Sequence, residues 1–199
     1  MHKFLSAIFI YLFLSLSVQA DDVKDALTAY QKNDFKTALK LLKPLANQGG
    51  VVTQFFVGYI YYNGHGVKRD YKQAIKWFRQ SAEQGNVDAQ TNLGFMYKNG
   101  QGVEQDYKQA VKWYRLAAEQ GDDSAQNSLG ISYEKGEGVI INYAEAARLY
   151  NLSARQGNKY GMYNLARMYS EGKGVEEDKI YAYMWFNLAD DAGHSSAKE

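Results

Sequence analysis

The chain has 199 residues, with 23 Lys and Arg against 22 Asp and Glu, and it contains no cysteine. This balanced charge argues against the basic surface that nucleic-acid binding requires. The missing cysteines exclude disulfides, zinc–thiolate clusters and thiol nucleophiles. A hydrophobic content of 46% with a single proline is typical of a folded chain rather than a disordered one.

Residues 1–20 have the pattern of a secretory signal peptide. Lys3 precedes an apolar run from Phe4 to Val18, and Val18-Gln19-Ala20 is a small-x-small cleavage pattern. We expect cleavage after Ala20 and a periplasmic or secreted product without a membrane span. The alternative is an uncleaved anchor, but a span needs about 20 apolar residues and this run is shorter.

Apolar residues at helical spacing predict two helices between residues 22 and 49. In the first, Val23, Ala26, Leu27 and Tyr30 share one face. The second contains Pro44, which we expect to kink the helix or to end its regular part.

A Gly-x-Gly-Val motif then recurs at a fixed step. Its second glycine stands at Gly66, Gly102, Gly138 and Gly174, which are 36 residues apart. A constant period of this size predicts a stacked array of helical repeats. A phosphate-binding glycine loop follows a strand, whereas a predicted helix precedes this motif. We therefore interpret its first glycine as a helix C-cap.

Each repeat is predicted to be a pair of helices. In the first helix a small residue lies between large core residues, and we expect it to let another helix approach closely; it is Gly58, Gly94, Gly130 or Ala166. The second helix opens with a strong N-cap residue, which is Asp70, Asp106, Asn142 or Asp178. Gln73, Gln109 and Glu145 stand three residues later, as in a capping box.

These motifs together resemble the Sel1-like repeat, in four copies over residues 50–85, 86–121, 122–157 and 158–193. Residues 22–49 look like a tetratricopeptide-type pair, and residues 194–199 like the start of a truncated helix. The resemblance implies one repeat domain over residues 21–199, an all-α, right-handed α-solenoid of antiparallel helix pairs. It also implies a protein-binding scaffold, of a kind common in the bacterial envelope or in host interaction.

The four copies allow core positions to be separated from positions that are free to bind. At about 100° per residue, Thr91, Phe95 and Lys98 lie on the side of their helix opposite the core residue Leu93. In related solenoids that side lines the concave groove. The predicted groove residues are Phe55, Tyr59 and Tyr62; Thr91, Phe95 and Lys98; Asn127 and Ile131; and Tyr160, Tyr163 and Arg167.

Two interpretations of the aromatic part of this row stay open. Apolar side chains on a face that the fold does not need indicate recognition of a protein or peptide. Alternatively, Phe55, Tyr59 and Tyr62 pack on the N-terminal helix as a cap. At the other end, Trp185, Phe186 and Leu188 suggest weak self-association.

No catalytic constellation is evident. His65 and His194 lack a second ligand at suitable spacing, and we expect both at the surface. Paired carboxylates fall at helix ends and loops, where no pocket raises a pKa. We therefore expect a non-enzymatic adaptor without metal or cofactor; the alternatives are a glycan- or peptidoglycan-binding module and, less favoured, a cell-wall or β-lactam hydrolase.

Overall fold

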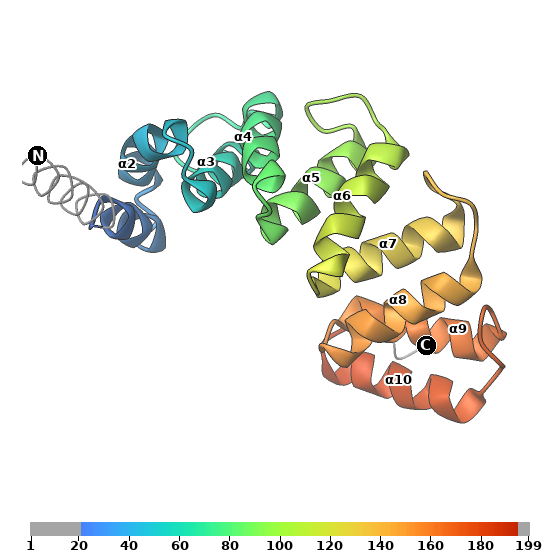
Figure 1. Ribbon diagram of the computed structural model, residues 1–199. Coiled ribbons are helices and arrows are strands. Elements are labelled where there is room, and N and C mark those ends of the chain that lie inside the picture. The colour runs from blue at the N-terminus through green and yellow to red at the C-terminus, as the bar shows by residue number, and fades with distance from the viewer. Residues whose placement is uncertain (1–20, 195–199) are drawn as a thin grey trace, which may run out of the picture. The chain divides into compact units, whose positions relative to one another are not determined.

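The computed structural model describes residues 21–194, so the predicted signal peptide and residues 195–199 lie outside the described part. Residues 21–31 are helical, and nine helices of 13 residues each follow (Figure 1). They are α2 (Phe35–Asn47), α3 (Val51–Asn63), α4 (Tyr71–Glu83), α5 (Val87–Asn99), α6 (Tyr107–Glu119), α7 (Asp123–Lys135), α8 (Tyr143–Arg155), α9 (Lys159–Glu171) and α10 (Lys179–Asp191). Residues 21–194 contain no strand, and the all-α prediction is confirmed.

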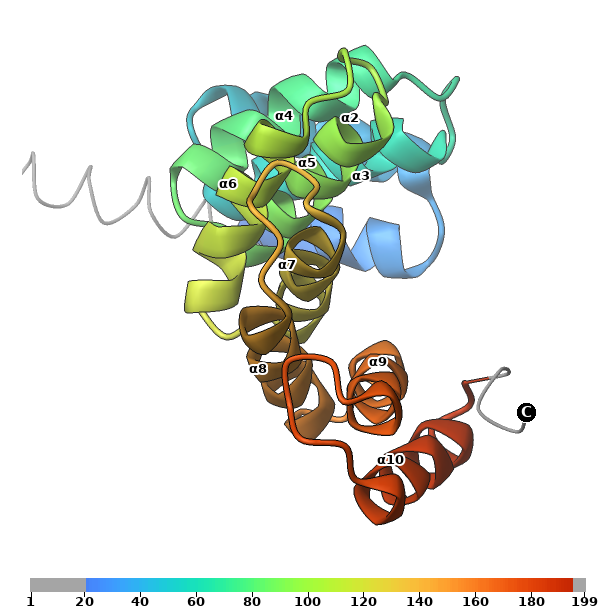
Figure 2. The same ribbon diagram turned by 90° about the vertical axis from the view of Figure 1, so that its right-hand side faces the viewer.

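The described residues form two compact units, unit 1 up to Asn86 and unit 2 from Val87 onward. In unit 1, α2 packs on α3 and α3 packs on α4. In unit 2, each helix from α5 to α10 packs on the next, and α7 also contacts α9 (Figures 1 and 2). The boundary falls between α4 and α5, so each unit holds whole helix pairs.

Every second helix of the repeat begins at the predicted N-cap. The Asp70 side chain accepts a hydrogen bond from the backbone N–H of Gln73 at 3.0 Å. The backbone N–H of Asp70 donates to the carbonyl of Tyr61, at 2.9 Å, near the end of α3. The reciprocal bond of a capping box is therefore replaced by a bond between the two helices of one repeat.

In the first three repeats the glycine of the first helix lies against an aromatic ring of the second helix. A Cβ at Gly58 would lie 2.8 Å from the ring of Phe78, and one at Gly94 or Gly130 would lie 2.7 Å from a tyrosine ring. These rings belong to Tyr114 and Tyr150, which are fully buried. The helix-propensity cost of glycine, about 1 kcal/mol, is offset by this close packing.

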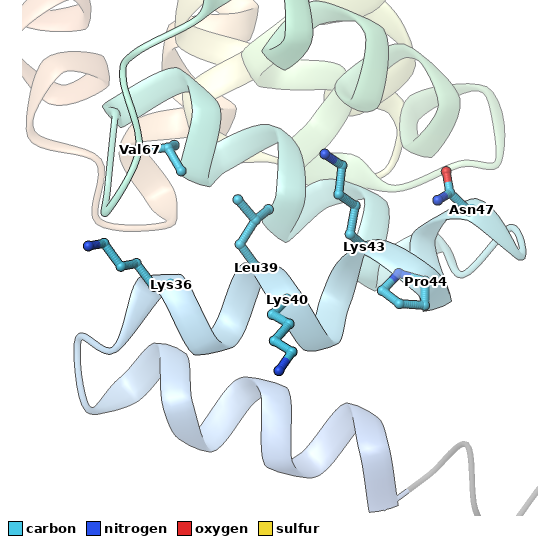
Figure 3. Close-up of a pocket in the computed structure, with 7 residues that line it drawn as sticks. All are labelled: Lys36, Leu39, Lys40, Lys43, Pro44, Asn47 and Val67. Carbon is cyan, nitrogen blue, oxygen red and sulfur yellow. The ribbon is translucent and has the colours of Figure 1, made fainter.

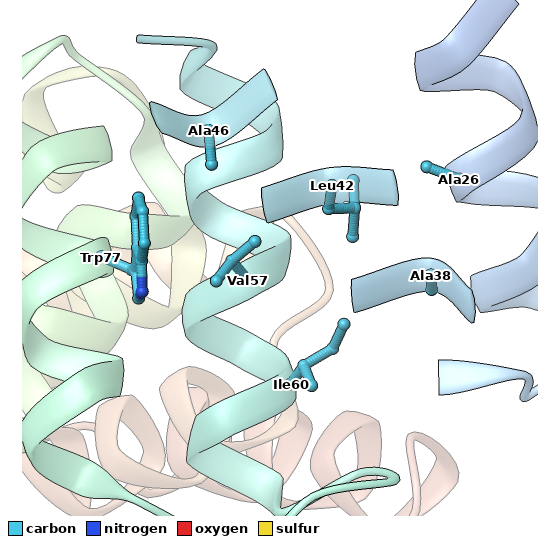
Figure 4. Close-up of a cluster of buried hydrophobic side chains, with 7 residues drawn as sticks. All are labelled: Ala26, Ala38, Leu42, Ala46, Val57, Ile60 and Trp77. Atoms are coloured by element: carbon cyan, nitrogen blue, oxygen red, sulfur yellow. The ribbon is translucent and has the colours of Figure 1, made fainter. Parts of the chain in front are cut away.

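The core of unit 1 joins the N-terminal helix to the first repeat. Ala26, Leu42, Val57, Ile60 and Trp77 belong to one buried cluster, against which Val67 of the glycine loop also packs (Figure 4). A corresponding cluster in unit 2 includes Tyr150, Leu165 and Met168, with Val175 packed against it. The loop valine therefore closes the core beside its helix pair.

Pro44 does not end α2, because the helix continues to Asn47. The carbonyl of Pro44 accepts a hydrogen bond from the N–H of Gln48 at 3.2 Å. Pro44 is exposed, and its ring faces solvent. Proline at this position removes the one hydrogen bond that its N–H would donate to the carbonyl of Lys40, and the helix continues for three more residues.

Candidate functional site

All eleven predicted groove residues lie on the first helices of the repeats, which are α3, α5, α7 and α9. Residues three or four positions apart stack along one face of a helix. The three aromatic residues of α3 belong to unit 1, and the other eight residues belong to unit 2. The two groups differ in how far they are covered.

Two of the three predicted aromatic residues of α3 pack against α4. The ring of Phe55 lies 5.8 Å from the ring of Phe78, and the ring of Tyr62 lies 5.4 Å from that of Tyr71. Phe55 also contacts Tyr59 at 5.9 Å between ring centres. All three predicted residues are half-buried, so part of each ring remains open to solvent.

Tyr59 also lies near the N-terminal helix. Burial, with a smaller electrostatic contribution from Tyr59, raises the pKa of Tyr30 in that helix. The ring contact that reaches this helix from α3 is made by Phe56, which lies 4.9 Å from Tyr30 between ring centres. Phe55 and Tyr62 pack on the helix that follows them.

The expectation that both histidines lie free at the surface is wrong. The ring of His65 stacks on the ring of Phe35 at 4.3 Å, and the ring of His194 stacks on that of Tyr163 at 4.2 Å. Both histidines are half-buried, and the Nδ1 atom of each is buried without a hydrogen-bond partner. His65 occupies the variable position of the first glycine loop, and that position contacts the helix pair before it.

In unit 2 the groove residues of α7 and α9 bond to one another. The side chain of Asn164 donates to Asn127 Oδ1 at 2.9 Å, and Asn127 is buried. Arg167 donates to Glu134 Oε1 at 3.0 Å, and the Tyr150 hydroxyl donates to Glu134 Oε2 at 2.7 Å. This part of the predicted groove is a packed polar seam between successive first helices.

The groove residues of α5 make similar contacts to the following repeat. Thr91 donates to Asp122 Oδ1 at 3.1 Å, and Asp122 is the N-cap of α7. Lys98 Nζ lies 3.2 Å from Glu137 Oε2, at the variable position of the third glycine loop. This pairing of a first helix with the next loop was not expected from the sequence.

Two predicted residues remain clearly exposed in unit 2. Phe95 on α5 is 43% exposed, and Tyr160 on α9 is 53% exposed. By contrast, Ile131 packs against the buried cluster around Tyr150, and Tyr163 lies between His194 and Phe186. Phe95 and Tyr160 are therefore the predicted groove residues that offer the most ring surface for contact.

The described residues provide no evident catalytic centre. No group of three or more His, Cys, Asp or Glu within residues 21–194 is placed to hold a metal ion. Burial raises the pKa of the Asp122 carboxyl, but this carboxyl accepts the N–H of Ala125 at 2.6 Å as a helix cap. In the same part of the chain, no helix is both long and apolar enough to cross a membrane.

Tandem pairs of 13-residue helices, with a glycine loop that recurs every 36 residues, define a helical-repeat protein. The Sel1 repeat model matches residues 51–86, 87–122, 123–158 and 159–194, and the chain belongs to this family. Each match begins one residue later than the repeat inferred from sequence alone. Proteins built from Sel1 repeats are typically non-enzymatic protein-interaction scaffolds.

Solved structures give the same result. A protective antigen of uropathogenic Escherichia coli strains with an SLR fold is 36% identical, with a TM-score of 0.86, over 90% of this chain and 39% of its own. A Sel1 repeat protein of Oxalobacter formigenes is 29% identical, with a TM-score of 0.82. The match covers 90% of this chain and 73% of that protein. The chain thus spans 39% of the first relative's length.

Cysteine-rich protein B of Helicobacter pylori is similar in fold alone. It is 24% identical, with a TM-score of 0.52, over 66% of this chain and 95% of its own. The present chain has no cysteine, so its helix pairs are held by packing and hydrogen bonds. No protein of curated function matches the sequence.

Proposed function

We propose that this protein is an exported, non-enzymatic adaptor that binds a protein or peptide through the concave face formed by its first helices. The observation that carries the proposal is the exposure of Phe95 and Tyr160, at 43% and 53%. The ring of Tyr160 contacts that of His194 at 5.4 Å between ring centres, and about half of each residue stays open to solvent. Exposed aromatic residues on such a face are typical anchors of protein recognition.

The neighbouring polar seam supports this role. Asn127, Glu134 and Arg167 are held by hydrogen bonds to adjacent helices. A rigid face loses little conformational entropy when a ligand binds, so the exposed rings are presented at low cost. An extended or helical peptide is the ligand that fits a row of side chains spaced along stacked helices.

Export is part of the proposal and rests on residues 1–20, with their basic start, apolar run and small-x-small cleavage pattern. A relative that is 36% identical is a protective antigen of uropathogenic Escherichia coli strains, which supports a role in the envelope or in host interaction. Fractionation of expressing bacteria, with mass measurement of the product, tests this part. Product that begins at residue 21 outside the cytoplasm is expected; retention of residues 1–20 would contradict it.

Affinity capture of envelope proteins tests the binding face. We expect Phe95→Ser and Tyr160→Ser to reduce capture of a specific partner at least tenfold with little change in melting temperature, because both rings are exposed. The matched control is Leu116→Ser, an exposed apolar residue on the second helix α6, and it should capture normally. Capture that survives both groove changes would contradict the proposal.

A glycan ligand and an enzymatic role are the competing outcomes. Exposed tyrosine rings also stack on sugars, so the same variants are tested in a pull-down with peptidoglycan. Binding there, with no protein captured, would replace the peptide by a glycan. Hydrolysis of cell-wall material or of a β-lactam by the purified protein would overturn the non-enzymatic part.

A further inference from the structure

The solvent face of α10 is apolar where α4 and α6 carry lysine. Ile180 and Met184 occupy the positions held by Lys72 and Lys76 in the first copy. Ile180 is 82% exposed, and Met184 is exposed as well. Exposed charges at these positions keep a solenoid soluble, so their replacement by apolar side chains indicates a surface that contacts another molecule.

Tyr183 enlarges this apolar surface. Its counterparts Ile75, Val111 and Ala147 are buried, whereas Tyr183 is 69% exposed. Tyr181 and Leu188 on the same helix are also exposed. Together with Ile180, Met184 and Tyr183 they form a contiguous group along one helix, which we call the α10 surface.

Acidic residues surround the α10 surface. Glu176, Glu177 and Asp178 precede the helix, and Asp190 and Asp191 lie at its end. Residues 176–191 contain a single basic residue, Lys179, which pairs with Glu177 at 2.9 Å. Five acidic and one basic residue give this segment a net charge of −4.

A complementary surface lies on α2, in the other unit. This helix carries Lys36, Lys40 and Lys43 and no acidic residue. The lysines border an open hollow of about 560 Å³, whose apolar lining includes Leu39, Pro44 and Val67. Figure 3 shows Leu39 pointing toward the loop that carries Val67. We call this hollow the α2 groove.

The charge difference extends to the whole units. Residues 21–86 contain ten basic and six acidic residues, a net charge of +4. Residues 87–199 contain twelve basic and sixteen acidic residues, a net charge of −4. Opposite charges at two surfaces accelerate encounter and fix orientation, while like charges in direct contact oppose it.

We propose that the α10 surface of one copy docks in the α2 groove of a second copy. Burial of the apolar side chains supplies the favourable free energy, and the lysines of α2 face the carboxylates that surround α10. A symmetric contact of α10 with α10 would place two acidic segments together, so the charges favour the unlike pairing.

Two variants separate the two surfaces. Ile180→Lys with Met184→Lys restores on α10 the residues of the first repeat, and Lys36→Glu with Lys40→Glu reverses the charge of the groove. All four residues are exposed, and circular dichroism checks that the fold is kept. The matched controls are Ala144→Lys, at the position equivalent to Ile180, and Lys72→Glu with Lys108→Glu on other helices.

Sedimentation velocity of the purified protein measures the association. The unchanged protein is expected to associate with rising concentration, and less so in high salt. Each double variant alone should raise the dissociation constant by about tenfold or more, and the controls should not. A mixture of the two double variants should again form a complex of two chains, because each supplies the surface that the other lacks.

Any of four results would overturn the proposal. The unchanged protein could stay monomeric at high concentration. The groove variant could still associate by itself, which would indicate symmetric pairing of α10. The mixture could fail to form a complex, or the controls could weaken association as strongly as the double variants do.

Discussion

The second glycine of the first, third and fourth loops lies against the start of an earlier second helix. Gly138 has a φ of +77°, and a Cβ there would overlap the carbonyl group of Tyr107. Gly174 is placed in the same way against Tyr143, and Gly66 lies near Phe35. The loop therefore joins successive helix pairs within a unit through a contact that only a residue without a side chain can make.

Gly138→Ala tests this contact against a glycine with free space. Gly121 has a φ of +94° and no atom within 4 Å of its Cβ position. Both changes cost about 1–2 kcal/mol of left-handed strain, but Gly138→Ala should cost about 1–3 kcal/mol more because the Tyr107 carbonyl must move. Chemical denaturation measures both, and equal losses would show that the close contact contributes nothing.

Asp122 offers a pH-dependent test at the same scale. Burial raises its pKa in the folded state, so the folded chain binds this proton more tightly than the unfolded chain does. The contribution of Asp122 to stability therefore falls as the pH rises through the range in which this carboxyl titrates. Asn86 and Asn158 hold the same repeat position, so Asp122→Asn should preserve the cap.

The raised pKa of Asp122 therefore predicts how the effect of Asp122→Asn on stability changes with pH. Asp122→Asn should gain stability relative to the unchanged protein at pH 7, because the amide replaces the charged form that burial disfavours. The gain should shrink at pH 3, because a raised pKa favours the neutral carboxyl there. Thermal unfolding of both proteins at the two pH values measures this difference, and a gain that is larger at pH 3 would contradict it.

At the scale of the element, each second helix depends on its N-cap. The side chain of Asp106 accepts bonds from the N–H groups of Lys108 and Gln109, at 2.9 and 3.0 Å. Asp106→Ala should therefore lower the free energy of unfolding by about 1 kcal/mol. Asp106→Asn should retain most of this stabilisation, because an asparagine, Asn142, caps the equivalent helix α8.

Chemical denaturation with Glu104→Ala as the control checks this prediction. Glu104 is an exposed carboxylate in the preceding loop, so its loss reproduces the change in net charge without removing a cap. The cap account fails if Glu104→Ala and Asp106→Ala lower stability equally.

The same elements show how far sequence alone reaches. A constant step of 36 aligns the copies, so caps such as Asp70, small residues such as Gly58 and buried rings such as Phe78 follow from comparing them. The side of each first helix follows from helical geometry. How closely one first helix approaches the next does not, because that distance depends on contacts between repeats. For this reason the burial of Asn127 and its bond with Asn164 could not be anticipated.

The histidines illustrate the same limit. His65 and His194 occupy positions that vary between copies, and variable positions are usually exposed. The structure stacks them on Phe35 and Tyr163, residues 30 or more positions away in the sequence. A single chain without aligned relatives gives no signal for such pairs. The exposed residues Phe95 and Tyr160 were identified because their face is set by periodicity alone.

At the scale of the whole molecule, the division into two compact units predicts that a destabilising substitution in one unit affects mainly the stability of that unit. Val57 in unit 1 and Val111 in unit 2 are both buried, and truncating either to alanine should cost about 2 kcal/mol. Most stabilising contacts lie within a unit, and in a repeat protein stability is carried by neighbouring elements. Val57→Ala should therefore lower the hydrogen-exchange protection of residues 21–86 more than that of residues 87–194.

Val111→Ala is the matched change, and it should give the reverse pattern. Hydrogen exchange followed by mass spectrometry of peptides from both units measures the two profiles under conditions where the chain is folded. If either change lowers protection equally in both units, the molecule opens as one cooperative body, and the boundary between Asn86 and Val87 has no energetic meaning.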